Sequence, residues 1–424
     1  MKISDFFKNE MSDYSCYSTY RMIASAVDGL KNAQRKSVYV AISDLKNSVK
    51  VSQFAGNVAL KTEYLHGDVS LQGVIQGLAS DYCGSNNLPI FEGEGNFGTR
   101  FMPTPSAPRY TFVNRPKYFD DIFDVRDVFE KQYFEGEEIE PKFLLPAIPL
   151  LVVNGSLAAI GSGFRQDILP RSISDILKYY KGEKTSLIPF FKGFKGDIVE
   201  TEPGKFLVKG KYERVKKDIV IYEIPVGYSY RQYLDVLDNS GFKYEDFSDA
   251  EKDTFSFRVY GIEDKQISKL KLEKSFSENY VALDRNNKVK VFENIHQILD
   301  YYKSIRLEFL EKQRQFDLEK WGKELLICAS RYKFVCDVMD EKLIINKRAK
   351  NDIVEDMKKL SYYDDNGFDY LLNMSIHSFT KETLEKLVKA IKDLKIRIES
   401  KKNEDLNKTF LDNIKQFEEL KWHN

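Results

Sequence analysis

The last third of the chain carries apolar residues at the spacing of narrow helical stripes. Two stripes follow four-three-four spacing, the first with a skipped turn at Lys312: Ile298, Tyr302, Ile305, Phe309 and Phe316, then Leu387, Ile391, Leu394 and Ile398. From Ile295 onward the chain lacks proline and is dense in Glu, Lys and Leu, which favours long helices. We expect the stripes to pair as an antiparallel coiled coil, although an ordinary helical bundle has the same pattern.

A compact stretch separates the two stripes. Its apolar anchors are Ile344, Ile345, Val354, Met357, Leu360, Tyr370 and Leu371. We expect these residues to form a small globule that caps the coiled coil.

The middle of the chain has the alternating pattern of β strands. Residues 218–224 alternate and stop at Pro225, and Asn286-Asn287 separates residues 280–283 from 289–292. Before Asp120, by contrast, short helical patterns alternate with Gly-rich turns, as in compact α+β modules. We therefore predict three domains, 1–125, 126–294 and 295–424, with function concentrated in the first.

Composition narrows the class of protein. The chain has 424 residues, and 65 Lys and Arg balance 65 Asp and Glu, so global charge alone does not hold it to nucleic acid or to a membrane. Four cysteines form no CxxC pair and only four histidines are present, which argues against a zinc site and for reduced thiols. No secretory or membrane-spanning segment is indicated, so we expect a cytoplasmic protein.

A local basic patch could still bind phosphate. Seven cations between positions 21 and 61 face only Asp28 and Asp44: Arg21, Lys31, Arg35, Lys36, Lys46, Lys50 and Lys61. A helix starting near Gly29 would place Lys31 and Arg35 on one face, with Gln34 able to add a hydrogen bond to a nucleic-acid backbone. A solvated helix face without a ligand has the same pattern.

A second candidate is the Arg109-Tyr110 dipeptide, which follows a Gly-rich loop. A phenol has a pKa near 10 and attacks phosphorus well only where cations stabilise the phenolate and the phosphoryl oxygens. Arg109 would supply one cation, although a tyrosine often has only a packing role. His66 is a phosphate donor or proton shuttle if it faces the same cleft, and otherwise part of a turn before an Asp68 N-cap. Asn96-Phe97-Gly98 indicates a turn first and a phosphate cradle second.

The order and spacing of these motifs is more specific than any one of them. The series is Arg21, Asp28-Gly29-Leu30-Lys31, Arg35, His66-Gly67-Asp68, Gly95-Asn96-Phe97-Gly98, Pro108-Arg109-Tyr110, Leu151-Val152-Val153-Asn154-Gly155-Ser156 and Ile168-Leu169-Pro170. It resembles the cleavage subunit of type IIA DNA topoisomerases, such as gyrase A, over roughly residues 10–175. The hairpin pattern at 280–292, leading into the coiled coil, extends the similarity nearly to the end. No ATP-binding signature or acidic metal-binding domain is apparent, so the chain is most similar to the medium subunit of the split enzymes of tailed phages.

The resemblance implies an α+β multidomain fold with a winged-helix breakage-reunion domain (1–125), a mixed α/β tower (126–294) and a long antiparallel coiled coil ending in a helical dimerising gate (295–424). Because the sequence stops at Asn424, we do not expect the DNA-wrapping domain of gyrase A.

The resemblance also assigns roles to residues. Tyr110 matches the nucleophile and Arg109 its neighbouring phosphate contact, while Arg21, Lys31 and His66 match basic positions that line the scissile phosphate. Gln34, Arg35 and Lys36 match the adjoining DNA contacts, Asn96 and Gly98 shape the loop before the nucleophile, and Ile168 matches an isoleucine that wedges between base pairs. Gln34 replaces a histidine of gyrase A, and Tyr64-Leu65 replaces its His-Pro.

The implied reaction is ATP-dependent strand passage through a transient 5′-phosphotyrosyl double-strand break in duplex DNA. It implies a homodimer and a separate ATPase and metal-binding subunit that holds ATP and Mg²⁺, with no metal ligands on this chain. Two other functions stay open: a non-catalytic dimeric winged-helix protein that bridges DNA, and a tyrosine recombinase that leaves a 3′-phosphotyrosine. If the chain is phage-encoded, the compartment is the host cytoplasm.

Overall fold

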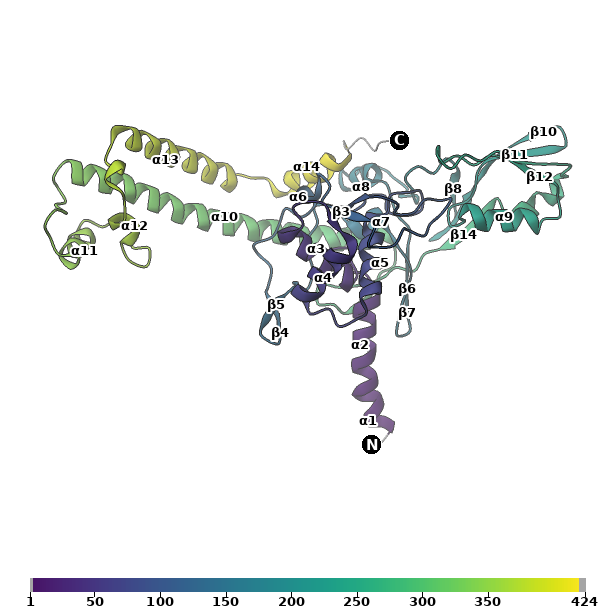
Figure 1. Cartoon of the computed structure of the whole chain (residues 1–424), viewed down its shortest axis with the longest axis horizontal. Coiled ribbons are helices and arrows are strands. Elements are labelled where there is room, and N and C mark those ends of the chain that lie inside the picture. The colour runs from purple at the N-terminus through teal and green to yellow at the C-terminus, as the bar shows by residue number, and fades with distance from the viewer. Residues whose placement is uncertain (1–2, 419–424) are drawn as a thin grey trace. The chain divides into compact units, whose positions relative to one another are not determined.

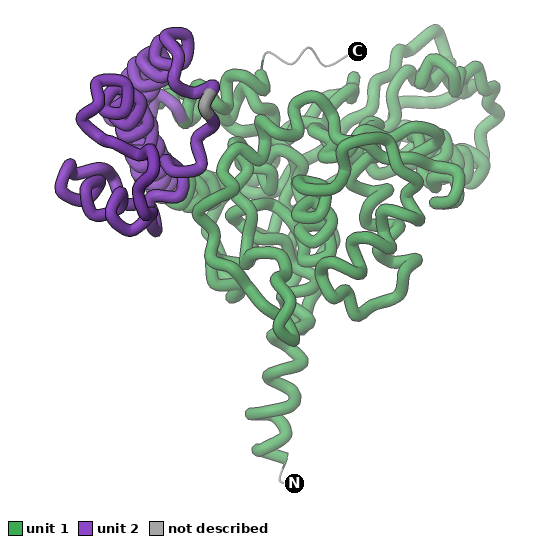
Figure 2. The backbone as a smooth tube through the Cα atoms, turned by 60° about the vertical axis from the view of Figure 1, so that its left-hand side comes forward, with its two compact units in different colours: residues 1–307, 410–424 green, residues 308–409 purple. Residues whose placement is uncertain are grey.

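The computed structural model describes residues 3–418, so residues 1–2 and 419–424, at the ends of the first and third predicted domains, lie outside it. Helices and mostly short strands alternate along the chain (Figure 1). The chain forms two compact units, one of residues 1–307 with 410–424 and one of residues 308–409 (Figure 2). Within the described residues, no helix combines the length and the apolar composition needed to cross a bilayer.

The N-terminal part is a helical module with a small sheet. Its helices are α1 (Ile3–Lys8), α2 (Glu10–Met22), α3 (Asn32–Asp44), α4 (Val51–Thr62) and α5 (Asp68–Ala79). The antiparallel sheet has the order β1-β3-β2, from β1 (Val49–Lys50), β2 (Glu92–Glu94) and β3 (Phe112–Asn114). Helices α3, α4 and α5 bury apolar side chains such as Val38, Val58 and Ile75, as amphipathic helices do in a shared core.

Short elements lead from this module to the β-rich region. They are α6 (Phe119–Ile122), β4 (Gln132–Phe134), β5 (Glu137–Ile139), α7 (Leu150–Asn154), β6 (Ser156–Gly161), β7 (Phe164–Ile168) and α8 (Ile173–Tyr180). Strands β4 and β5 form one hairpin, and β6 and β7 form another. At Gly155, φ is +70° and a Cβ atom would lie 2.6 Å from the Ile168 carbonyl oxygen, so this close approach requires glycine.

The β-rich region contains two larger antiparallel sheets and a hairpin. Its elements are β8 (Asp197–Glu202), β9 (Lys205–Lys209), β10 (Lys211–Val215), β11 (Asp218–Glu223), α9 (Tyr230–Asp238), β12 (Tyr244–Asp246), β13 (Phe257–Val259), η1 (Asp264–Leu270), β14 (Glu273–Ser277), β15 (Val281–Leu283) and β16 (Val289–Val291). The sheets have the orders β10-β11-β13-β12 and β14-β9-β8. Tyr233 and Leu237 of α9 join Ile219, Ile221 and Phe257 in one core cluster. The strand expected at 218–224 and the hairpin around Asn286-Asn287 are thus confirmed as β11 and β15–β16.

The last third is helical, as expected. Its elements are α10 (Ile295–Met339), α11 (Lys350–Lys359), α12 (Asp369–Leu372), η2 (Ile376–Ser378), α13 (Lys381–Lys402) and α14 (Leu406–Glu418). Helices α10 and α13 run antiparallel, because successive contacts step in opposite directions: Arg314 to Glu404, Asp317 to Lys401 and Trp321 to Arg397. This register places Leu387–Ile398 beside a later part of α10 than the first stripe.

The start of that first stripe therefore has a different partner from the one predicted. The Tyr302 hydroxyl donates to the Pro146 carbonyl over 2.6 Å, and the Tyr302 ring lies 6.3 Å from that of Phe410. Ile298 and Tyr302 are buried within the unit of residues 1–307 and 410–424. Spacing identified the buried face of α10 but not what covers it.

The globule between α10 and α13 is confirmed as a core cluster. Met357 and Leu371 are fully buried in it beside Phe334, whereas the predicted anchor Ile344 is 58% exposed. Ile345, Val354, Leu360 and Tyr370 pack around the cluster.

Candidate active site

Tyr110 lies in a turn directly before β3. Its backbone N–H donates to the Ala107 carbonyl over 2.8 Å, and its side chain is 70% exposed. The Arg109 guanidinium lies 5.8 Å from the centre of the Tyr110 ring, and Arg109 is exposed as well. A phenol and a permanent cation are thus presented side by side to solvent.

The N-terminus of α4 holds this turn. The backbone N–H of Ser52 donates to the Pro108 carbonyl over 3.3 Å, and that of Val51 donates to the Thr111 carbonyl over 3.0 Å. The first N–H groups of a helix have no partner within the helix, so the turn supplies their acceptors. The backbone on both sides of Tyr110 is thereby fixed to a rigid element.

Gln76 of α5 and Ser80, the C-cap residue of that helix, hold the same region through side chains. Gln76 Nε2 donates to the Ser106 carbonyl over 2.8 Å and to Thr111 Oγ1 over 3.1 Å, and Ser80 Oγ donates to the Phe97 carbonyl over 3.1 Å. The motif series did not include Gln76 or Ser80. The feature of the sequence that could have identified Gln76 is its position next to Ile75, where a glutamine falls on the buried side of α5.

Asn96 and Gly98 form the turn expected of them. The Gly98 N–H donates to Asn96 Oδ1 over 2.8 Å, and the Ser106 N–H donates to the Asn96 carbonyl over 3.0 Å. At Gly98, φ is +95° and a Cβ atom would lie 2.5 Å from the Pro103 carbonyl oxygen, so another residue would strain the loop. These contacts link the Gly-rich loop to the segment that carries Tyr110.

Arg21 and His66 lie near each other, in a cluster that is separate from Tyr110. The Tyr17 hydroxyl is hydrogen-bonded to His66 Nε2, which ties α2 to a residue two positions before the start of α5. Burial, and then the positive charge of Arg21, lower the pKa of His66 below its ordinary value. Among residues 3–418, no hydrogen bond or ion pair connects this cluster with Tyr110. Asp68 is the first residue of α5, and Gly67 takes the N-cap position expected for Asp68.

Lys31 and Gln34 lie at the start of α3. Lys31 is the N-cap, and its N–H donates to Gln34 Oε1 over 2.9 Å. Lys31 lines a cavity of about 180 Å³ with Asn86, Asn154 and Ser156, and burial lowers the pKa of the lysine. Helix α3 begins at Asn32, and the Arg35 N–H donates to the carbonyl of the N-cap Lys31 over 2.9 Å, but Lys31 is half-buried whereas Arg35 is buried.

Arg35 and Lys36 were predicted to contact DNA, but both side chains are buried. Arg35 is fully buried, and its Nε donates to Asp28 Oδ2 over 2.6 Å. Lys36 is buried too and pairs with Glu140 Oε2 over 2.9 Å, while its ammonium also donates to the Thr62 carbonyl. Both cations are enclosed with acceptors inside the protein, so neither reaches a DNA phosphate in this structure.

Ile168 is corrected in the same way. It is fully buried at the end of β7, where it pairs with Ser156 of β6. The exposed large apolar side chains of this hairpin are Leu157, Ile160 and Phe164. Ile168 reaches no base pair in this conformation.

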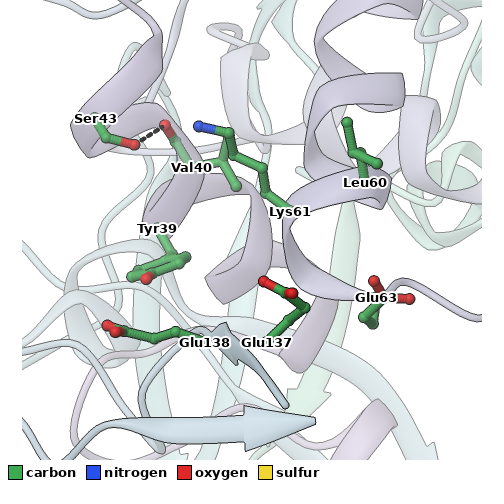
Figure 3. Close-up of a pocket in the computed structure, with 8 residues that line it drawn as sticks. All are labelled: Tyr39, Val40, Ser43, Leu60, Lys61, Glu63, Glu137 and Glu138. Carbon is green, nitrogen blue, oxygen red and sulfur yellow. Dashed lines mark hydrogen bonds between the residues drawn. The ribbon is translucent and has the colours of Figure 1, made fainter. Parts of the chain in front are cut away.

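A cavity of about 410 Å³ between α3, α4 and β5 has the wrong charge for DNA (Figure 3). Glu63, Glu137 and Glu138 line it, and its single lysine, Lys61, pairs with Asp44 over 2.7 Å. Carboxylates repel phosphate, so this cavity is not part of the candidate site. Within the described residues, no group of three or more His, Cys, Asp or Glu side chains gathers to hold a metal ion.

The fold and the site define an α+β protein in which a helical module presents an exposed Arg-Tyr turn. The chain belongs to the family of DNA gyrase and topoisomerase IV A subunits, whose model matches residues 21–418. The family predicted from the motif series is thereby confirmed.

Three similar proteins show how far the likeness extends. The chain is 32% identical to DNA topoisomerase 2 of Invertebrate iridescent virus 6, over 93% of this chain and 37% of that protein. It is 29% identical to mitochondrial DNA topoisomerase 2 of Dictyostelium discoideum, over 98% and 35%. A crystal structure of the Plasmodium falciparum topoisomerase II DNA-binding, cleavage and re-ligation domain has a TM-score of 0.86 and 28% identity, over 98% of this chain and 64% of that one. The chain thus spans about a third of the length of these curated relatives.

Proposed function

We propose that this chain is the DNA-cleaving and religating subunit of an ATP-dependent type II DNA topoisomerase. The observation that carries the proposal is the exposed Tyr110 beside Arg109, on a turn fixed by α4 and α5. Such a turn supplies an exposed phenol, a permanent cation and a backbone held by hydrogen bonds, which nucleophilic attack on phosphorus requires.

The reaction is a reversible transesterification. Tyr110 Oη attacks the scissile phosphorus, the bond from phosphorus to the 3′ oxygen breaks, and a 5′-phosphotyrosine forms. The phenol gives up one proton and the leaving 3′ oxygen takes one up, so no oxidant is needed and religation is the same step in reverse. Arg109 stabilises the charge on the phosphoryl oxygens, and Arg21, His66, Lys31 and Gln34 bind neighbouring phosphates.

Cleavage of both strands needs two tyrosines, so the working form is a homodimer with a two-fold axis. In this proposal, the N-terminal module with sheet β1-β3-β2 is a winged helix, and the β-rich region is the tower. The α10–α13 pair is the coiled coil, and the Phe334–Leu371 cluster is the dimerising gate.

ATP and Mg²⁺ belong to a separate subunit in this proposal, and the chain is the medium subunit of a tailed-phage enzyme that acts in the host cytoplasm. When bound, magnesium neutralises oxygens near the scissile phosphate. In this proposal its ligands come from the separate subunit.

The test is covalent capture. The full-length chain is mixed with a candidate ATPase and metal-binding subunit, supercoiled DNA and Mg²⁺, and the adduct is trapped by denaturation and mapped. We expect a 5′ adduct that Tyr110→Phe abolishes while the DNA Kd stays within a few-fold.

Tyr133→Phe is the matched control, because Tyr133 is also exposed but lies on β4, and it should leave the adduct unchanged. An adduct that survives Tyr110→Phe would refute the nucleophile, and a 3′ adduct would favour a recombinase. DNA bridging without any adduct would favour the non-catalytic protein.

A further inference from the structure

Helix α5 has one polar side chain on its otherwise apolar buried face. Leu71, Ile75 and Leu78 of this face lie in the core, and Gln76 beside them is only 5% exposed. A buried amide is unfavourable unless its hydrogen bonds are made, so the partners of Gln76 show what it does.

Both N–H groups of the Gln76 amide are used on the Tyr110 segment. One donates to the Ser106 carbonyl over 2.8 Å and the other to Thr111 Oγ1 over 3.1 Å. Ser106 precedes Tyr110 and Thr111 follows it, so one side chain joins the two ends of the segment that carries the tyrosine. Thr111 is itself fully buried, so the acceptor is fixed as well.

The other anchors of this segment are backbone groups. Ser52 and Val51 donate from their main-chain N–H groups, and any residue at those positions except proline supplies the same bonds. Gln76 is a side-chain anchor, and its effect on Tyr110 depends on residue identity.

We propose that Gln76 is a positioning residue for the nucleophile. By holding the two ends of the 106–111 segment together, Gln76 orients Tyr110 for in-line attack on the phosphorus. The inference rests on the function proposed above. Gln76 touches neither DNA nor the reacting atoms; it acts through Thr111 and Ser106, and its loss slows the chemical step without weakening DNA binding.

The test uses the assembled enzyme with its partner subunit, Mg²⁺ and duplex DNA. Gln76→Met keeps the side-chain length and removes both hydrogen bonds. We expect single-turnover adduct formation to fall about 10- to 100-fold, the range in which small misplacements of a reacting group operate. The DNA Kd should stay within about two-fold of the wild-type value.

Thr111 makes the test specific for the hydrogen bond. Thr111→Val removes the acceptor hydroxyl but keeps the shape, and should lower the adduct rate by less than Gln76→Met does. Thr111→Ser keeps the hydroxyl and should restore most of the rate. The double variant Gln76→Met with Thr111→Val should be no slower than Gln76→Met alone, because the shared bond is already lost.

Asn87→Leu controls for loss of stability. Asn87 is 6% exposed, and its Nδ2 donates to the Val153 carbonyl over 3.0 Å and the Phe190 carbonyl over 2.8 Å. This variant should lower the melting temperature at least as much as Gln76→Met does while the adduct rate stays within about two-fold.

The inference is overturned if Gln76→Met cleaves within two-fold of wild type, if its DNA Kd rises in proportion to the loss of rate, or if the two substitutions are additive. Tyr110→Phe, run in parallel, separates the two proposals. An adduct in Tyr110→Phe refutes the proposed function, whereas its absence together with normal cleavage by Gln76→Met refutes the role of Gln76 alone.

Discussion

Arg109 and Arg35 belong to the same N-terminal module but occupy opposite environments. Arg109 lies exposed beside Tyr110, and no carboxylate among residues 3–418 pairs with it. Arg35 is fully buried against Asp28, which also accepts hydrogen bonds from the backbone N–H groups of Leu30 and Leu144. The same residue type therefore lies exposed beside the tyrosine in one place, where we propose that it binds phosphate, and holds the fold together in the other.

The comparison indicates that the two arginines have different roles because Arg35 lies beside a buried carboxylate, Asp28, and Arg109 does not. Asp28 is itself fully buried, and an unpaired charge there is far less stable than a paired one. Arg35 therefore contributes to stability through the cost of its removal, whereas an exposed cation such as Arg109 contributes little to stability. Substitutions in the two regions should separate stability from catalysis.

The largest effect is expected at the buried pair. Arg35→Met leaves the Asp28 carboxylate buried without its partner, and should lower the free energy of unfolding by about 3–5 kcal/mol. Urea unfolding of the full-length chain, followed by circular dichroism, measures the change. Arg109→Met is the matched control and should stay within about 0.5 kcal/mol of wild type. Equal losses in the two variants would remove the distinction between the two arginines.

The second effect concerns chemistry instead of stability. Arg109→Gln removes the cation beside Tyr110, and should slow adduct formation in the assembled enzyme by about 10²- to 10³-fold, as loss of one charge-stabilising group does elsewhere. Single-turnover cleavage gives the rate. Lys117→Gln, which removes an exposed cation outside the turn, should cleave at the wild-type rate. A normal rate in Arg109→Gln would mean that other groups stabilise the phosphoryl oxygens.

A smaller effect separates two glycines near the site. Gly98→Ala forces a left-handed φ and a clash with the Pro103 carbonyl, and should destabilise the protein by about 1–3 kcal/mol. Gly73→Ala lies inside α5 with open space around it, and should stabilise by about 0.5–1 kcal/mol. Urea unfolding of both variants checks the sign of each change, and a shift in the same direction for both would contradict this account.

Local patterns predicted the elements of this fold well. The alternation at 218–224 and the proline-free last third identified β11 and the long helices, because hydrophobic periodicity reports which face of an element is buried. The pattern does not report what covers that face. Tyr302 was placed in a coiled-coil stripe, but it packs on Phe410 and the Pro146 carbonyl, which lie far away in sequence.

For the candidate site, too, the sequence predicted local features but not the contacts between distant segments. The motif order selected Tyr110, Arg109 and His66 at exposed or half-buried positions, but the burial of Arg35 depends on Asp28, Leu30 and Leu144 coming together in the folded chain. The role of Gln76 depends on Ser106 and Thr111 in the same way. Contacts between distant segments are set by tertiary packing, which one sequence does not display.

The smallest effect tests the second cationic cluster through the protonation of His66. Burial is the main cause of the lowered pKa of His66 and Arg21 is the second, so Arg21→Ala should raise this pKa while leaving it below the ordinary value of 6.5. The folded chain binds this proton less well than the unfolded chain, so the contribution of His66 to the unfolding free energy declines as the pH falls from about 6.5 through the folded pKa. Arg21→Ala should make that decline smaller.

NMR titration of the imidazole, assigned with His66→Gln, gives the pKa of His66. The control is Lys46→Ala, which removes an exposed cation of the predicted patch and should leave the pKa of His66 unchanged. A pKa that stays the same or falls in Arg21→Ala would show that Arg21 exerts no field on His66, and the two side chains would then not act together on a phosphate.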